Sequence, residues 1–589
     1  MNVHMRNPTG FSPIRLHRLS SAGRRSDEWT VRYDGLFDIF PESYWSHFTT
    51  LTSVALRCRL QHPARLRLIR RRVDGSTAGL RGAPGTETVL CDFDCDAAEA
   101  ILVTPLAAAD APESLLLLEV VAHESSYAHP VPLLEAAWEA NEEPVRVASL
   151  GLAITTFNRE SFLIANLARL HGRMAGGCVV VVNHGPPGLE ARLRNLLPQN
   201  PAIRWIDQEN SGGAGGFTRG MVEHHIAGDV THVLLMDDDI DLPDDLVERA
   251  SAILSYTRPE VCLGGAMFDY HQRTRLFSAG DVLIPGSFGL GHIAPPEGCD
   301  VATTQGVDFL ARIHRPDFNG WWCFAFPIEA IERVGLPMSC FIRGDDVEFG
   351  YRLKCAGMPT LGWPGLAVWH MPFADKSAPW HMFYDRRNSL FTNARYRRVG
   401  RASAIAKLVG GFTHHLLRYD YDRVRAMTLG IAAFNQGPGA MERWTHHDHA
   451  ALIAATSTMA LTDAETGRDA AIGGGAPRLE ARRLAGVSRS LRMVGRLALD
   501  LAGWPIGHTA PHRLPPGAIW RPDFVRRPAA AMEYDAHDQL LRVYRRDPSE
   551  TRRATWRCIR ALAGMVLHFY RAAPVAAVAI SSESPIFGD

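Results

Sequence analysis

The chain has 589 residues, with 63 Lys and Arg against 63 Asp and Glu, so its formal net charge is zero. A balanced charge provides no global attraction to a polyanion, and nucleic acid is therefore excluded as an expected partner. The length predicts about three or four domains. The ten cysteines lack zinc-type spacing, which indicates reduced thiols and a cytoplasmic protein.

The N-terminal part divides into a leader and a β-rich segment. Residues 1–30 are polar and Arg-rich without the apolar core of a signal peptide, and we expect a disordered leader. Apolar and basic residues then alternate with period two, as in Ser53–Leu60 and Arg65–Arg70, which is typical of half-buried antiparallel strands. A β-sandwich domain is therefore predicted over residues 31–148. Tyr44 and Trp45 either stack on a sugar or, as we favour, belong to its core.

Strands and helices alternate over about 90 residues from residue 149, within a catalytic domain expected over residues 149–395. Short apolar runs and amphipathic stretches follow one another, which favours an α/β domain with a parallel, doubly wound sheet. In such sheets, ligands bind at the carboxyl ends of the strands. The expected strands cover residues 149–156, 178–182, 203–207 and 231–236.

Three adjacent carboxylates, Asp237, Asp238 and Asp239, follow the last of these strands. They repel one another unless a cation is bound between them. Mg²⁺ and Mn²⁺ prefer one or two carboxylates together with the phosphates of a substrate. We expect a divalent metal site here; the alternative is a solvated acidic loop.

A glycine-rich stretch, residues 210–220, precedes that strand. Glycines ahead of a helix allow backbone N–H groups to approach a phosphate. The dinucleotide fingerprint would follow the first strand and a Walker sequence would contain a lysine, and neither pattern is present. A nucleotide sugar is the favoured ligand.

Three further groups carry candidate chemistry. Trp321 and Trp322 follow a tight turn, where a tryptophan pair either stacks on a sugar or packs in a core. Asp345 and Asp346 precede a helix and form a second carboxylate pair, one of which can act as a base. His370 ends a short strand and is a candidate metal ligand.

Taken in order, these motifs resemble the bacterial galactan-building galactofuranosyltransferases, inverting GT-A enzymes of glycosyltransferase family 2. The resemblance covers about residues 35 to 400, including Phe40–Trp45. Its motifs are Thr-Phe-Asn-Arg, Asn-x-Gly-Gly-x-Gly-Gly, Met-Asp-Asp-Asp-Ile, Asn-Gly-Trp-Trp, Phe-Ile-x-x-Asp-Asp-x-x-x-Gly and Trp-His-Met.

The resemblance implies a role for each of these residues. UDP-galactofuranose is the implied donor, and a lipid-linked galactofuranosyl glycan is the implied acceptor in cell-wall polysaccharide synthesis. Gly344 and Phe373 stand where the family has tryptophans, and Asn183 replaces an expected acid. The implied roles are general base for Asp346; donor binding for Arg159, Asn183, Asn210, Asp237 and Asp238; acceptor binding for Asp345, Trp321 and Trp322; and Mn²⁺ or Mg²⁺ binding for Asp237, Asp239 and His370.

A mainly helical domain is expected over residues 396–589. The basic amphipathic stretch 395–418 either lies on the inner face of the cell membrane or packs within the protein. The run Ala561–Ile580 is interrupted by polar residues, so a spanning helix is not expected. The residues His446 to His449 could bind a metal adventitiously, and the resemblance adds a homo-oligomer as an expectation.

Two other functions stay open at this stage. The chain could be a family 2 transferase that uses a rhamnosyl or hexopyranosyl donor, because the shape of the donor pocket cannot be deduced from the sequence. It could also be an inert glycan-binding protein, although the intact carboxylates at Asp237, Asp239 and Asp346 argue against this.

Overall fold

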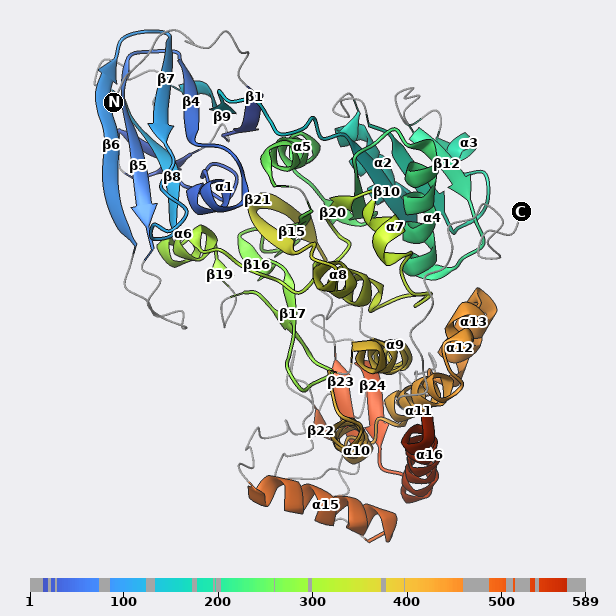
Figure 1. The fold of residues 1–589 in the computed structure, drawn as a ribbon. Coiled ribbons are helices and arrows are strands. Elements are labelled where there is room, and N and C mark those ends of the chain that lie inside the picture. The colour runs from blue at the N-terminus through green and yellow to red at the C-terminus, as the bar shows by residue number, and fades with distance from the viewer. Residues whose placement is uncertain are drawn as a thin grey trace.

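The protein consists of a β-sandwich, a central α/β domain and a helical region that projects from it, as the computed structural model shows (Figure 1). The structure describes residues 14–19, 23–26, 29–73, 85–122, 133–171, 177–193, 196, 203–258, 260–294, 299–371, 378–396, 398–458, 487–504, 512–513, 530–534 and 540–568.

Two antiparallel sheets form the N-terminal domain, with strand orders β1-β9-β4-β7 and β2-β3-β8-β5-β6. Residues from both sheets share one apolar core, which includes Tyr44 and Trp45, exposed by 0% and 1%. The core interpretation of this aromatic pair is therefore confirmed. The elements are β1 (Ile14–Arg18), β2 (Arg24–Arg25), β3 (Thr30–Tyr33), α1 (Glu42–Phe48), β4 (Ser53–Leu60), β5 (Ala64–Arg72), β6 (Thr86–Cys95), β7 (Glu99–Pro105), β8 (Ser114–Ala122) and β9 (Leu133–Ala140).

The expectation of a disordered leader over residues 1–30 is wrong for β1 and β2. Strand β1 pairs antiparallel with β9 and buries Leu16 and His17. The arginines around them gave this segment a polar composition, but an edge strand needs only a few inward-facing side chains to join a sheet. Residues 1–13 lie outside the described part of the chain.

The central sheet runs in the order β12-β11-β10-β13-β20-β15-β16-β19. Its first four strands are parallel, as predicted, whereas β20 is antiparallel to both neighbours. The sheet as a whole is therefore mixed, and the parallel arrangement predicted for its first four strands is confirmed. The chain reaches β20 through several short strands rather than through one crossover helix, so no parallel direction is imposed on it.

Apolar faces of the central helices pack on this sheet. The strands are β10 (Leu150–Thr156), β11 (Val179–Asn183), β12 (Ile203–Asp207), β13 (His232–Asp237), β14 (Ile240–Asp241), β15 (Cys262–Asp269), β16 (Arg275–Ser278), β17 (Asp281–Leu283), β18 (Leu290–His292), β19 (Cys299–Asp300), β20 (Phe324–Pro327) and β21 (Thr360–His370). The helices are α2 (Glu160–Leu170), α3 (Leu189–Leu193), α4 (Gly212–Ala227), α5 (Leu246–Tyr256), α6 (Thr304–Ala311), α7 (Ala330–Val334) and α8 (Asp345–Cys355).

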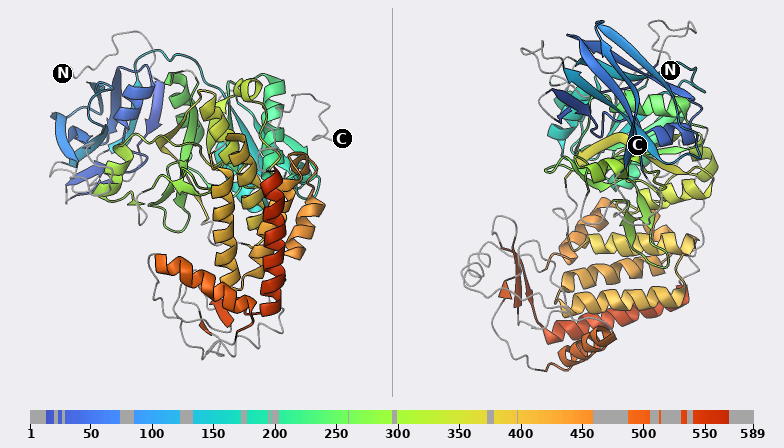
Figure 2. Two further views of the ribbon diagram at one scale, coloured as in Figure 1. Left: turned by 60° about the horizontal axis from the view of Figure 1, so that its bottom comes forward. Right: turned by 90° about the vertical axis from the view of Figure 1, so that its left-hand side faces the viewer.

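The C-terminal region is mainly helical, as predicted, and its long helices lie side by side (Figure 2). Its elements are α9 (His381–Tyr396), α10 (Arg401–Leu417), α11 (Tyr421–Asn435), α12 (Gly439–Glu442), α13 (His446–Ala455), α15 (Val487–Leu501), α16 (Pro548–His568) and the small sheet of β22 (His512–Arg513), β23 (Ala530–Tyr534) and β24 (Leu540–Arg545).

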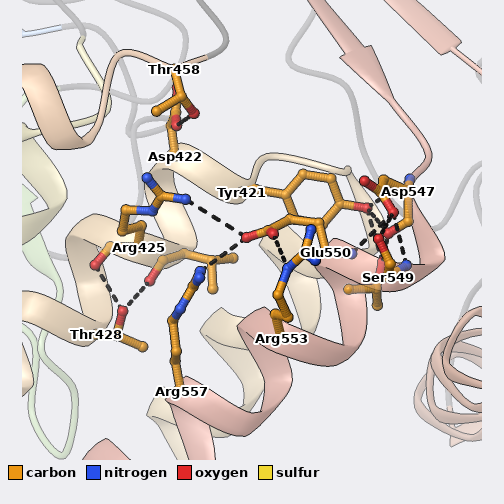
Figure 3. Close-up of polar contacts among 12 residues, drawn as sticks. Tyr421, Asp422, Arg425, Thr428, Thr458, Asp547, Ser549, Glu550, Arg553 and Arg557 are labelled. Atoms are coloured by element: carbon orange, nitrogen blue, oxygen red, sulfur yellow. Dashed lines mark hydrogen bonds and ion pairs between the residues drawn. The ribbon is translucent and has the colours of Figure 1, made fainter.

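Polar contacts fasten the last helix to α11 (Figure 3). The Tyr421 hydroxyl donates to the main-chain oxygen of Asp547 at 3.0 Å and lies 2.9 Å from the Thr551 hydroxyl. Arg425 Nη2 of α11 lies 3.7 Å from Oε1 of Glu550, which also accepts hydrogen bonds from Arg553 and Arg557 on its own helix. The chain thus returns from residue 547 to complete the helical core.

The amphipathic segment identified in the sequence is α10, and its apolar face is buried. Leu408, Phe412 and Leu416 belong to the core that α10 shares with α11 and α16. These side chains are therefore unavailable to a lipid surface, which decides between the two alternatives for this helix in favour of packing. Within the residues the structure describes, no helix is long and apolar enough to cross a bilayer.

Candidate active site

An Asp and His cluster lies at the carboxyl end of β13. Possible ligand atoms of Asp237, Asp239 and His370 all lie within 4.8 Å of one another. Asp237 ends the strand, and Asp239 occupies the turn between β13 and β14. The structure thus brings together the three residues predicted to hold a metal.

Strand pairing explains how His370 reaches this cluster. The short strand β14 pairs antiparallel with the end of β21, and Ile240 lies opposite His370. Asp239, the residue immediately before β14, is therefore held beside the imidazole. Its Oδ1 lies 3.2 Å from Nε2 of His370.

The donor set fits a divalent cation. Nδ1 of His370 lies 2.7 Å from the main-chain oxygen of Met371, to which it donates its hydrogen. In the neutral imidazole, Nε2 then presents a lone pair to a carboxylate oxygen, and this contact is favourable only with a proton or a metal ion between the two atoms. Two carboxylates and one imidazole are ligands that suit Mn²⁺, and Mg²⁺ shares the carboxylate preference.

The middle carboxylate of the triplet differs from its neighbours. Asp238 is 8% exposed, and burial raises its pKa to about 7. Its main-chain oxygen accepts a hydrogen bond from Asn166 Nδ2 at 3.0 Å. Within the described residues, the group of possible ligand atoms formed by Asp237, Asp239 and His370 does not include Asp238. This geometry favours a structural role for Asp238 over the expected donor contact.

Arg159 lies beside the acidic cluster. Its Nη1 is 2.9 Å from Oδ2 of Asp239, and its side chain is 41% exposed. Arg159 precedes α2, and its neighbour Asn158 has a positive φ of 56° that turns the chain out of β10. The guanidinium therefore stands at the carboxyl edge of the sheet, where it can contact an anionic group bound by the same cluster.

The glycine-rich stretch is a helix rather than the loop we expected. Helix α4 begins at Gly212, and its glycines allow close packing on β10. A Cβ atom at Gly216 would lie 2.4 Å from Thr155, and one at Gly220 would lie 2.6 Å from Ala153. Helix–strand packing therefore accounts for these two glycines without a phosphate.

Asn183 and Asn210 fix turns at this sheet edge. The Asn183 amide donates to the Pro186 oxygen at 2.9 Å and to Asp207 Oδ1 at 2.7 Å. Asn210 Oδ1 accepts from the Gly212 N–H at 2.9 Å. Asp207, which lies opposite Asn183 in the strand register, supplies the carboxylate missing from position 183. The sequence contained one signal for it, an acid at the end of a neighbouring strand.

The second carboxylate pair shares a cavity with Asp237, one of the three possible metal ligands. Asp345 and Asp346 form the first turn of α8, and a cavity of about 880 Å³ is lined by both, by Asp237 and by Trp321 and Trp322. Predicted metal, base and acceptor residues therefore share one space.

The environment of this pair suppresses its ionisation. Loss of hydration raises the pKa of Asp345 and Asp346 above the ordinary value of 3.8, and the negative charge of Asp345 raises the pKa of Asp346 further. Backbone N–H groups of the first turn, including that of Val347 at 2.8 Å from Asp346 Oδ1, oppose the shift. A raised pKa suits a group that must accept a proton near neutral pH.

The tryptophans pack mainly in the cores. Each is 5% exposed, and Trp322 Nε1 donates to the Gly265 oxygen at 2.9 Å. Trp321 packs edge-to-face on Phe217, with ring centroids 5.3 Å apart. Both have part of the ring at the cavity wall, so they are not the open stacking surface that the sequence suggested.

Sequence reasoning missed the clamp that holds the Asp345–Asp346 pair. Phe341, Arg343 and Gly344, just before α8, all have a positive φ, of 65°, 64° and 90°. Asn388 Nδ2 on α9 lies 3.2, 3.0 and 2.6 Å from the main-chain oxygens of Cys340, Ile342 and Arg343. Non-glycine residues in this conformation persist only where the surroundings hold them.

We expect Asn388→Ala to lower kcat about tenfold to a hundredfold, because displacement of a reacting group by about 1 Å has effects of this size. KM for the donor should change little, since the Asp237 cluster does not depend on this loop. Steady-state kinetics measure both values. Asn435→Ala, at a half-buried asparagine of α11 outside the cavity, is the control, and an equal loss of kcat there would point to general destabilisation.

A second group of possible metal ligands lies at the surface. His446 and His447 on α13 meet Glu209, and His446 Nδ1 is 2.8 Å from Glu209 Oε1. The third histidine of this run, His449, instead lies 3.0 Å from the Tyr384 hydroxyl.

Of the two positions at which the family has tryptophans, Gly344 lines the cavity, whereas Phe373 lies outside the described residues.

Fold and site together define an α/β domain with a group of possible metal ligands at the carboxyl end of its parallel strands. The family model described as glycosyltransferase like family 2 matches residues 148–388. This match supports the resemblance over residues 148–388, and the expected α/β fold class is confirmed.

Two curated relatives are galactofuranosyltransferases GlfT2. The chain is 28% identical to that of Mycolicibacterium smegmatis over 439 residues, which is 70% of this chain and 65% of the relative. It is 28% identical to that of Mycobacterium tuberculosis over 437 residues, 70% of this chain and 66% of the relative. The chain thus spans slightly less than two thirds of the length of each.

A solved structure with detectable similarity is a mannosyltransferase, PcManGT, from Pyrobaculum calidifontis in complex with GDP-Man and Mn²⁺. It is 15% identical, and the match covers 55% of this chain and 84% of that chain with a TM-score of 0.32. A score of this size does not equate the two folds.

Proposed function

We propose that the protein transfers galactofuranose from UDP-galactofuranose to a galactofuranosyl glycan with inversion at the anomeric carbon. One observation carries the proposal: Asp237, one of three clustered possible metal ligands, lines the same cavity as a carboxylate pair of raised pKa. A nucleotide-sugar transferase needs this combination, because one group must neutralise a departing diphosphate and another must accept a proton.

Each side chain then has a defined task. Asp237, Asp239 and His370 would hold Mn²⁺ or Mg²⁺, which supplies positive charge against the leaving diphosphate. Arg159 would contact the same diphosphate. The oxygen of the acceptor hydroxyl attacks the anomeric carbon from the face opposite UDP, and Asp346 accepts the proton of that hydroxyl. The C–O bond to UDP breaks, UDP leaves with the bonding electrons, and one attack gives inversion.

Release of UDP from UDP-galactofuranose tests the proposal. The assay contains Mn²⁺ or Mg²⁺ and a synthetic galactofuranosyl disaccharide on an alkyl chain. Turnover that requires both donor and acceptor supports it. Turnover with dTDP-rhamnose or a UDP-hexopyranose alone would retain the mechanism and reject the galactofuranose donor, whereas binding without turnover on any donor would favour an inert glycan-binding protein.

We also infer that the protein binds an anionic membrane surface through α16 rather than α10. Trp556, Ile559 and Leu567 are 61%, 52% and 69% exposed, and helical spacing places them on one side of α16. Arg552 and Arg560 are exposed on the same helix. Tryptophan with flanking arginines is typical of helices at a lipid–water interface, and an acceptor with a lipid anchor would be presented there.

Cosedimentation with vesicles measures this interaction. We expect binding to vesicles that contain phosphatidylglycerol and weaker binding to phosphatidylcholine alone. The Trp556→Ser, Ile559→Ser double variant should lose at least about tenfold, since full burial of each large side chain is worth about 1.5–3 kcal/mol and about 1.4 kcal/mol is tenfold. Leu429→Ser, at an exposed leucine of α11, is the control. Equal binding by all three proteins would reject α16 as the contact surface.

A further inference from the structure

The cavity continues past the carboxylate pair along α9. Ser389, Thr392 and Asn393 line it, and helical spacing places these three residues on one side of the helix. Residues from α10 and α11, including Leu408 and Met427, bound the same space. The wall on this side therefore belongs to the C-terminal helical region rather than to the glycosyltransferase domain.

Asn393 carries a buried acceptor without a protein partner. Its side chain is 6% exposed, and its Nδ2 donates to the Ser389 main-chain oxygen at 2.7 Å. That bond fixes the orientation of the amide, because the flipped side chain would bring two oxygens together. Among the described residues, Asn393 Oδ1 has no hydrogen-bond partner. A buried carbonyl oxygen of this kind normally accepts a hydrogen bond.

The same cavity holds an unpartnered donor. Trp321 Nε1 is buried and, in the part of the chain that the structure describes, has no hydrogen-bond acceptor. A ligand that satisfies both atoms must donate to Asn393 and accept from Trp321, which a hydroxyl-rich molecule does. Apolar side chains of Phe277, Leu283 and Leu290 complete the wall and suit the C–H faces of sugar rings.

We propose that Asn393 binds a hydroxyl of the acceptor glycan, on a sugar unit beyond the one that attacks the donor. This inference rests on the proposed function. Asn388 contacts the loop that precedes Asp345 and Asp346, and Asn393 lies five residues further along α9, or about 7.5 Å at 1.5 Å per residue. A short acceptor ends before this position, and a longer one reaches it. Asn393 thus makes the enzyme prefer longer chains.

The test compares binding of a galactofuranosyl disaccharide and tetrasaccharide by calorimetry, without donor. In the wild-type protein we expect tighter binding of the tetrasaccharide. Asn393→Ala and the near-isosteric Asn393→Leu should each weaken tetrasaccharide binding about fivefold to tenfold, the effect of one lost hydrogen bond to a neutral group, and leave disaccharide binding unchanged. The second variant fills the space of the amide and so guards against a packing defect.

Asn435→Leu is the matched control. Asn435 on α11 also donates through Nδ2 to a main-chain oxygen, that of Ala561, and its Oδ1 also has no partner among the described residues, but it lies outside the cavity. It should bind both glycans like the wild type. Equal weakening of both glycans by the Asn393 variants, or no weakening, would overturn the subsite.

Binding without donor keeps this proposal distinct from the proposed function. If the wild type distinguishes the two glycans through Asn393 but transfers nothing from UDP-galactofuranose, the donor assignment fails and the subsite stands. If both glycans are elongated and the Asn393 variants do not distinguish them, the function stands and the subsite fails.

Discussion

Replacement of Asp346 by alanine should lower kcat by about 10²- to 10⁴-fold, the usual contribution of a general base. KM for UDP-galactofuranose should remain within about twofold, because the donor cluster at Asp237 belongs to another strand end. Single-turnover measurement of UDP release separates this loss of chemistry from slow product release. A variant that retains more than about a tenth of the wild-type kcat would exclude Asp346 as the base.

The pH profile supplies the control for this assignment. A base acts only when ionised, so kcat/KM should fall as the pH drops through the raised pKa of Asp346. The charge of Asp345 contributes to that rise, and Asp345→Asn should therefore move the acid limb to lower pH. An acid limb that does not move, or that moves to higher pH, would contradict the coupling of the two carboxylates.

Loss of the metal ligands should have an effect of similar size. Asp237→Ala and Asp239→Ala should each lower kcat/KM by about 10²- to 10³-fold, because neutralisation of a leaving group by a metal is worth several kcal/mol and each 1.36 kcal/mol is tenfold. Chelation by EDTA should abolish turnover of the wild type, and Mn²⁺ or Mg²⁺ should restore it. Titration of Mn²⁺ followed by electron paramagnetic resonance reports binding directly.

His370→Gln offers a graded comparison in the same assays. Glutamine retains an oxygen donor but loses the imidazole, so Mn²⁺ affinity should fall more than Mg²⁺ affinity. Asp238→Asn is the matched control within the triplet, since Asp238 is not part of the ligand group that the described residues form, and it should keep its metal affinity. Full activity after EDTA treatment and dialysis would reject a metal-dependent mechanism.

The sequence predicted most of the central fold because its signals are local. Apolar runs marked the four parallel strands, and the chain order of βαβ units implies their pairing and direction. The direction of β20 depends on contacts between distant segments and was not predictable from periodicity. The leader was mispredicted because β1 is stabilised by its pairing with β9, not by its own composition.

The candidate site was predictable where residues end strands. Asp237, Asp239 and His370 each follow an apolar run, so their shared position at one sheet edge followed from topology. Three features were not predictable: Asp238 does not join the group of ligand atoms, Gly216 allows close helix packing, and Asn388 contacts the loop before Asp345. They depend on side-chain direction and on contacts between segments that are far apart in the sequence.

The pairing of β14 with β21 also determines how much of the chain must be present before the three possible metal ligands can meet. During synthesis, Asp237 and Asp239 leave the ribosome long before His370, and the emerging chain cannot form the three-ligand site until β21 has joined the sheet beside β15. Asn388 follows later still, so the loop before Asp345 takes its final shape only once α9 has docked. A chain that ends before residue 388 would therefore contain all three possible metal ligands and both carboxylates but lack the side chain that contacts the loop before Asp345.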